Sequence, residues 1–83
     1  MTDTEGLDKL EVLLNHWIKH NNAHKDVYMK WAKKAGEFGA NACGQAISEA
    51  VHYMDITNDW LGTALMMKNE EDTMSRQPLT INH

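Results

Sequence analysis

The chain has 83 residues, a formal net charge of −4 and a pI near 5.6, so neither nucleic acid nor an anionic membrane is expected as its main partner. Hydrophobic residues make up 42% and charged residues 24%, which predicts one small globular domain near the lower size limit for a single core. The one cysteine excludes an intramolecular disulfide, and no apolar run approaches the ~20 residues that span a bilayer.

The opening segment MTDTEGLDKL has neither the basic nor the apolar region of a signal peptide, so the cytoplasm is the expected location.

The first predicted element is a helix from about residue 4 to about residue 35. Thr2 and Glu5 have the spacing of a capping box at its start, and Gly36 can take the left-handed conformation that ends a helix. Residues at alternating intervals of three and four form an unbroken a/d stripe. They are Leu7, Leu10, Leu14, Trp17, Asn21, His24, Tyr28 and Trp31.

The second predicted element is a helix from about residue 40 to about residue 68. Its stripe is Ala40, Gly44, Ile47, Val51, Met54, Asn58, Leu61 and Leu65. It is flanked on one side by Ala46, Ala50, Tyr53, Thr57, Trp60 and Ala64. Cys43 falls on the apolar side and is interpreted as a small core residue. Residues 69–83 are polar and show no period, so they are predicted to form a disordered tail.

These elements predict an all-α fold in which residues 1–68 form an antiparallel two-helix hairpin. Each apolar stripe is wider than a single neighbouring helix can cover. We therefore expect two hairpins to associate as a homodimer in a four-helix bundle.

The segment HWIKHNNAHKDVY, residues 16–28, places three histidines four residues apart. Residues at this spacing are neighbours on a helix, so His16 with His20, or His20 with His24, can chelate one ion. Neutral imidazoles at this spacing suit zinc, nickel, cobalt or copper. The outer two lie about 12 Å apart along the axis, so all three do not readily bind one ion. His20 is the preferred ligand because it can pair with either neighbour.

The alternative for His24 is structural. Its place in the stripe, with Asn21 and Asn58, predicts a buried polar seam that fixes register and oligomeric state. His16 projects furthest towards the polar side, and a solvated surface residue is the favoured interpretation for it.

Glu49 and His52 have the Glu-x-x-His spacing of di-iron carboxylate bundles. They project away from the apolar stripe, together with Asp55 and Asp59, whereas a di-iron site needs them inside. A solvated acidic face is the favoured interpretation, and a surface cation site formed by these residues is the weak alternative.

The segment LEVLLNHWIKHNNAHKDVYMKWAKKAGEFG, continuing to about Leu65, resembles a small, largely uncharacterised family of prokaryotic helical hairpins. Members carry a His-Trp-x-x-His-Asn-x-x-His run and then a Trp-Ala pair before the turn. The matching positions here are His16-Trp17, His20-Asn21, His24 and Trp31-Ala32. In some relatives the hairpin accompanies His-rich segments, so the resemblance implies a link to nickel, cobalt or zinc. This chain has no His-rich tract, which argues against bulk metal buffering.

Two functional hypotheses follow, and in neither is the protein an enzyme. The first is a dimeric hairpin that carries or senses a divalent transition metal through His20 and His24, with His16 or a carboxylate completing the ligand set. The second is a structural module, or one that binds a protein partner, in which Asn21 and His24 fix packing and register. The two differ in whether the rings of His20 and His24 converge on a shared point.

Overall fold

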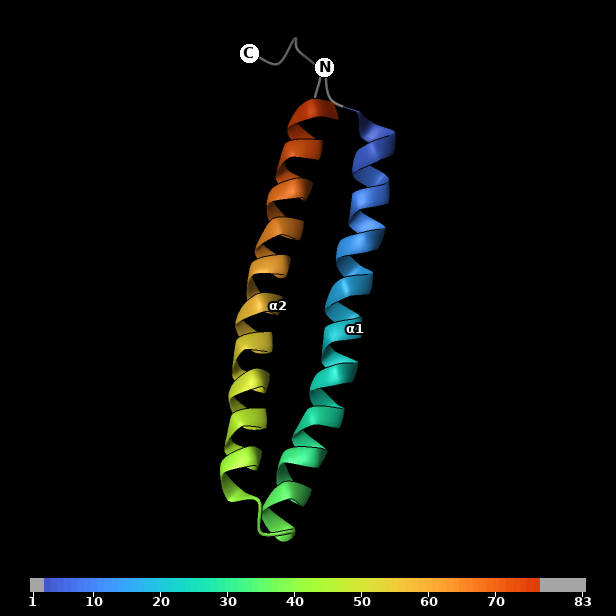
Figure 1. The fold of residues 1–83 in the computed structure, drawn as a ribbon. Coiled ribbons are helices and arrows are strands. Elements are labelled where there is room, and N and C mark those ends of the chain that lie inside the picture. The colour runs from blue at the N-terminus through green and yellow to red at the C-terminus, as the bar shows by residue number, and fades with distance from the viewer. Residues whose placement is uncertain (1–2, 77–83) are drawn as a thin grey trace.

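The computed structural model describes residues 3–76, which form two long helices, α1 (Thr4–Glu37) and α2 (Asn41–Arg76). The helices run antiparallel, side by side along their whole length (Figure 1). The predicted all-α hairpin is confirmed. Within residues 3–76, neither helix is long and apolar enough to cross a membrane.

The start and end of α1 are set by Asp3 and Gly39. The Asp3 carboxylate accepts a hydrogen bond from the Gly6 N–H at 3.0 Å, so Asp3 caps the helix, whereas the predicted capping residue Thr2 lies outside the described residues. Helix α1 continues through Gly36 to Glu37, and Gly39 takes the positive φ of 85° instead. The Ala40 N–H donates to the Ala35 carbonyl oxygen at 2.8 Å and closes the connection.

The predicted end of the second helix near residue 68 is wrong, because α2 continues to Arg76. The reason is that polar residues extend the packed stripe. Lys68 is buried, with Nζ 2.6 Å from Glu11 Oε1 of α1 and 3.7 Å from Asp72 Oδ2 one turn further along. The remainder of the predicted tail, residues 77–83, lies outside the described residues.

The contact between the helices, here called the seam, follows the predicted stripe of α2 from Gly44 to Leu65. On α1 it follows a different series. Its buried or half-buried members there are Leu7, Leu14, Ile18, Asn21, Lys25, Ala32 and Ala35. The helices approach closely near the turn, since a Cβ at Gly44 would lie only 2.8 Å from the Ala32 carbonyl oxygen.

Five of the eight residues in the stripe predicted for α1 therefore lie outside the seam. Four of the five lie on a surface that we call the open face. We define it by eight exposed residues, four on each helix at intervals of seven: Leu10, Trp17, His24, Trp31, Ala46, Tyr53, Trp60 and Met67. Cys43, predicted to be a core residue, is also exposed. The interior of a two-helix hairpin covers only one side of each helix, so these positions stay uncovered.

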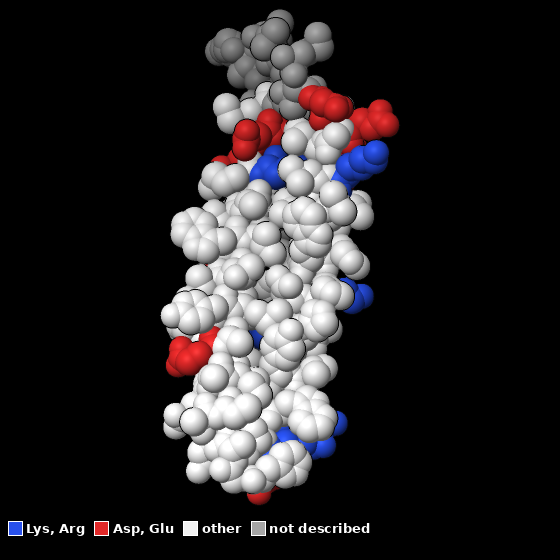
Figure 2. Space-filling view, viewed as in Figure 1, with Lys and Arg blue, Asp and Glu red and all other residues white. Residues whose placement is uncertain are grey.

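Both halves of the open face lie on the same side of the hairpin. Lys25 of α1 forms an ion pair with Asp55 of α2 across one side of the seam. Positions 24 and 53 project away from that side on their respective helices, at about 100° of rotation per residue. Figure 2 accordingly shows a broad face that is almost free of charged side chains between charged ends.

Candidate metal-binding histidines and the polar seam

The rings of His20 and His24 converge on the exposed surface of α1. Their Nε2 atoms lie 2.9 Å apart, within hydrogen-bond distance, and their ring planes cross at 86°. In neutral imidazoles this contact joins one N–H to the lone pair of the other ring. The predicted pairing of residues four apart is therefore present, and both Nε2 atoms face one point.

His16 and Tyr28 extend this pair along the helix without joining it. The centroids of His16 and His20 are 5.8 Å apart, and those of His24 and Tyr28 are 5.9 Å apart, with nearly parallel rings in both cases. All four side chains are exposed. His16 is thus next to the candidate ligands, but its ring stacks and does not converge with the other two.

The separation of the two Nε2 atoms suits a bidentate ligand for a divalent transition metal. Two nitrogens that are each about 2.1 Å from an ion lie about 3.0–3.4 Å apart at ordinary coordination angles. A small rotation of either ring from 2.9 Å reaches that range. Within residues 3–76, however, no group of three or more His, Cys, Asp and Glu side chains is placed to hold a metal. One chain supplies two ligands from this pair.

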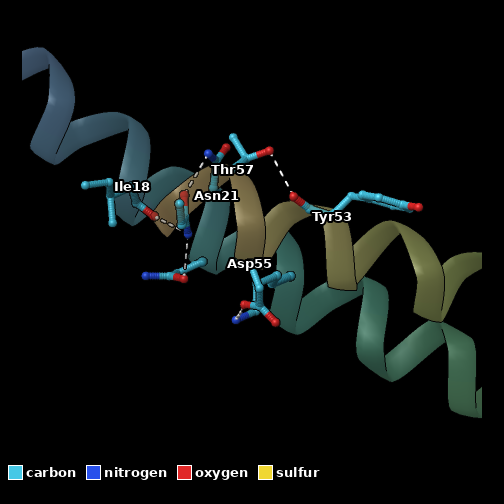
Figure 3. Close-up of polar contacts among 8 residues, drawn as sticks. Ile18, Asn21, Tyr53, Asp55 and Thr57 are labelled. Atoms are coloured by element: carbon cyan, nitrogen blue, oxygen red, sulfur yellow. Dashed lines mark hydrogen bonds and ion pairs between the residues drawn. The ribbon is translucent and has the colours of Figure 1, made fainter. Parts of the chain in front are cut away.

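Asn21 and Asn58 form the predicted polar seam at the middle of the hairpin. Figure 3 shows Asn21 and Ile18 among these polar contacts. Asn21 Nδ2 donates to Asn58 Oδ1 at 2.9 Å, and Asn58 Nδ2 donates to Asn22 Oδ1 at 3.0 Å and to the Ile18 carbonyl oxygen at 3.5 Å. The side chain of Asn58 thus reaches three groups on α1. This network fixes the register of the two helices, because sliding either helix by one turn separates the partners.

His24 does not belong to this seam, so its predicted burial is wrong for the single hairpin. On α1 the seam passes from Asn21 to Lys25. At about 100° of rotation per residue, position 24 lies about 60° from Asn21 around the helix, on the side away from Lys25. The pairing of Lys25 with Asp55, and of Glu11 with Lys68, was not anticipated from the sequence. The only signal for these pairs is opposite charge on two helices that an antiparallel hairpin brings together.

The weak alternative site on α2 is not assembled. Glu49, His52, Asp55 and Asp59 are all exposed. The Asp55 carboxylate accepts a hydrogen bond from Lys25, and the His52 ring meets Tyr53 edge-on at 5.5 Å between centroids. The solvated acidic face is the interpretation that fits this arrangement.

Residues 10–67, which include both candidate ligands and the whole polar seam, match the family described as Domain of unknown function (DUF8180). The chain belongs to this family. The match confirms the expectation of a little-characterised family, while the link to metals stays a prediction. No curated protein and no solved structure matches the chain.

Proposed function

We propose that this family member is a non-catalytic helical-hairpin module that forms a homodimeric four-helix bundle and binds a divalent transition metal, nickel, cobalt or zinc, through His20 and His24. The observation that carries the proposal is the open face, which concentrates uncovered apolar side chains around the two histidines. Trp17, Trp31 and Trp60 are 42%, 49% and 70% exposed. An isolated protein seldom leaves so continuous an apolar surface in water.

The dimensions of the open face support a dimer. Each helix is about 50 Å long at about 1.5 Å per residue, and two adjacent helices are about 20 Å wide, which gives about 1,000 Å² per copy. Stable protein interfaces bury about 800 Å² per partner. A second hairpin therefore supplies the apolar layer that the first one lacks, and the result is a four-helix bundle.

The convergence of the His20 and His24 Nε2 atoms supports metal binding. Borderline divalent ions favour imidazole nitrogen, and a pair already within one turn of a helix loses little conformational entropy on binding. His16 is the adjacent ligand candidate, since its ring stacks on His20.

A second candidate function is a structural or partner-binding module with no metal. The network around Asn58 supports it, because these hydrogen bonds fix the helix register without any ligand. In that case the contact between His20 and His24 is only a local hydrogen bond on the surface of the bundle.

Calorimetric titration of tag-free protein with NiCl₂, CoCl₂ and ZnCl₂ separates the two candidates. We expect stoichiometric binding that His20→Ala and His24→Ala each weaken at least tenfold and that the control His52→Ala leaves unchanged. Light scattering after gel filtration should give the mass of a dimer. Absence of saturable binding to all three ions contradicts the metal function, and a monomeric mass contradicts the dimer.

A further inference from the structure

Building on the proposed dimer, we infer that two copies pair through their open faces with their turns at opposite ends, so that His20 and His24 of both copies share one divalent cation. The site is then incomplete in a single chain, and the metal regulates association. Three features of the described residues support this arrangement: the charges at the two ends of the hairpin, the position of the histidines along α1, and the number of ligands per chain.

The charges at the two ends of the hairpin favour one of two possible orientations of the copies in the dimer. Residues 3–11 and 68–72, at the end distant from the turn, hold seven acidic residues and two lysines. Residues 27–48, around the turn, hold Lys30, Lys33 and Lys34 against Glu37. With the turns together, the two acidic ends meet and repel. With the turns opposed, each acidic end meets the basic end of the other copy.

The position of the histidines follows from the lengths of the helices. Helix α1 runs from Thr4 to Glu37, so its midpoint lies between His20 and Asn21. A twofold axis that opposes the turns crosses the hairpin near this level and places α1 against α1 of the second copy. His20 and His24 of each copy then lie within about 5 Å of the axis level at about 1.5 Å per residue.

The number of ligands makes the second copy necessary. The pair supplies two nitrogens per chain, and no described group of three or more ligating side chains completes a site. Nickel, cobalt and zinc take four or more ligands, as in a tetrahedral site. Two pairs supply four imidazole nitrogens. Because the metal then binds the dimer in preference to the monomer, mass action makes it stabilise the dimer.

Sedimentation equilibrium with ZnCl₂ as the probe tests the shared site. We expect the dimer dissociation constant to fall at least tenfold between EDTA and saturating ZnCl₂, and calorimetry to give one ion per two chains. His20→Ala should abolish this zinc effect and keep the metal-free dimer, whereas the control His52→Ala should keep both. One ion per chain with an unchanged dimer constant overturns the shared site and leaves the proposed metal binding intact. Absence of any dimer, with or without zinc, overturns the shared site and the proposed dimer together.

The single cysteine tests the orientation. Cys43 is exposed near the turn, about 15 residues from the midpoint of α2. A spin label there should give a distance of about 45 Å between copies when the turns are opposed, at about 1.5 Å per residue. With the turns together, helices packed 8–10 Å apart give less than about 20 Å. A label at Ser48→Cys in a Cys43→Ala background, on the other side of the seam, repeats the measurement. A short distance in both variants overturns the inference.

Discussion

The seam and the open face of this hairpin differ in the side chains that stand out on each. The seam is formed mainly by aliphatic residues such as Leu14 and Val51, with a few polar groups among them. The seam holds Asn21 and Asn58 at its centre and the buried Lys68 towards its end. The open face instead carries all three tryptophans, each at least 42% exposed. The largest apolar side chains, the tryptophans, thus lie where one chain cannot cover them.

The seam and the open face therefore have two different tasks, which are to fix the helix register and to drive association. Polar and charged contacts in the seam specify which residues of α1 meet which residues of α2, since each such group needs a particular partner. The open face is where large apolar areas remain to be buried, and burial is what supplies most of the free energy of association. Variants that alter one surface and leave the other unchanged therefore test whether the tasks are distinct.

The largest expected effect comes from breaking the open face with Trp60→Glu. Trp60 is 70% exposed, so its replacement should leave the helicity of the hairpin unchanged. Loss of a central tryptophan from an interface costs about 2–4 kcal/mol, so sedimentation should show dimerisation weakened by about 30- to 1,000-fold. Met66→Glu is the control, because Met66 is 53% exposed and projects from the other side of the seam. Equal weakening by both variants contradicts the assignment of the open face.

Asn21→Ala tests whether the seam depends on its polar centre. The substitution leaves Asn58 Oδ1 without the donor that lies 2.9 Å away in the native protein. We expect a loss of about 1–3 kcal/mol in the free energy of unfolding, measured by urea denaturation with circular dichroism. Asn15→Ala is the matched control, since among residues 3–76 the exposed Asn15 side chain bonds only to a carbonyl oxygen of its own helix. A similar small loss in both variants contradicts a specific role for Asn21.

Gly44→Ala tests the close approach of the helices near the turn. The new Cβ meets the Ala32 carbonyl oxygen at 2.8 Å, and the strain should outweigh the gain in helix propensity. Thermal denaturation should show a net destabilisation of about 1–2 kcal/mol. Gly62→Ala is the control, because nothing lies within 4 Å of a Cβ there, and it should stabilise the helix by up to about 1 kcal/mol. Stabilisation by both changes would show that the seam has room at Gly44.

The smallest expected effect is an alkaline loss of stability through Lys68. Its hydrogen bond to Glu11 raises the pKa of Lys68 above 10.5, against the opposing effect of burial. A raised pKa means that the folded state holds the proton more tightly, so this contribution is complete below the unfolded pKa and is lost as pH rises through the folded one. Urea denaturation from about pH 9 to about pH 12 should show that loss. Lys68→Met should remove this component of the pH dependence, whereas Lys9→Met should retain it.

The sequence predicts the packed face of α2 better than that of α1, because the packed series of α1 includes the charged residue Lys25. Its stripe from Gly44 to Leu65 is the observed seam. On α1, the predicted series through Trp17 and Trp31 is more apolar than the series that packs, which includes Lys25 and has the exposed Glu11 beside it. Pairing of those two with Lys68 and Asp55 compensates for their charge. Hydropathy alone cannot reveal such a pairing, since it depends on the partner helix.

Prediction of the candidate site from the sequence is limited in the same way, because part of it depends on the partner helix. The spacing of His20 and His24 predicts their convergence, because residues four apart on one helix are neighbours whatever the tertiary fold. The exposure of His24 was not predictable, since it depends on which of two adjacent series meets α2. The end of α2 was also missed because Lys68 and Asp72 continue the packed stripe as charged residues.

The short connection at Gly39 has a consequence for the order in which the hairpin forms. Contacts beside it join residues that are close in sequence, whereas the Asn21–Asn58 contact spans 37 residues and the Glu11–Lys68 contact spans 57. The entropy lost on closing a loop grows with its length. We therefore expect the contacts next to the connection to form first and the more distant contacts to follow in order. Amide hydrogens near the connection should then exchange most slowly, and those beyond Glu11 and Lys68 most rapidly. The Asn58 network lies between these regions at the middle of the hairpin, so an incorrect alignment of the helices should be disfavoured there before the outer half of the hairpin closes.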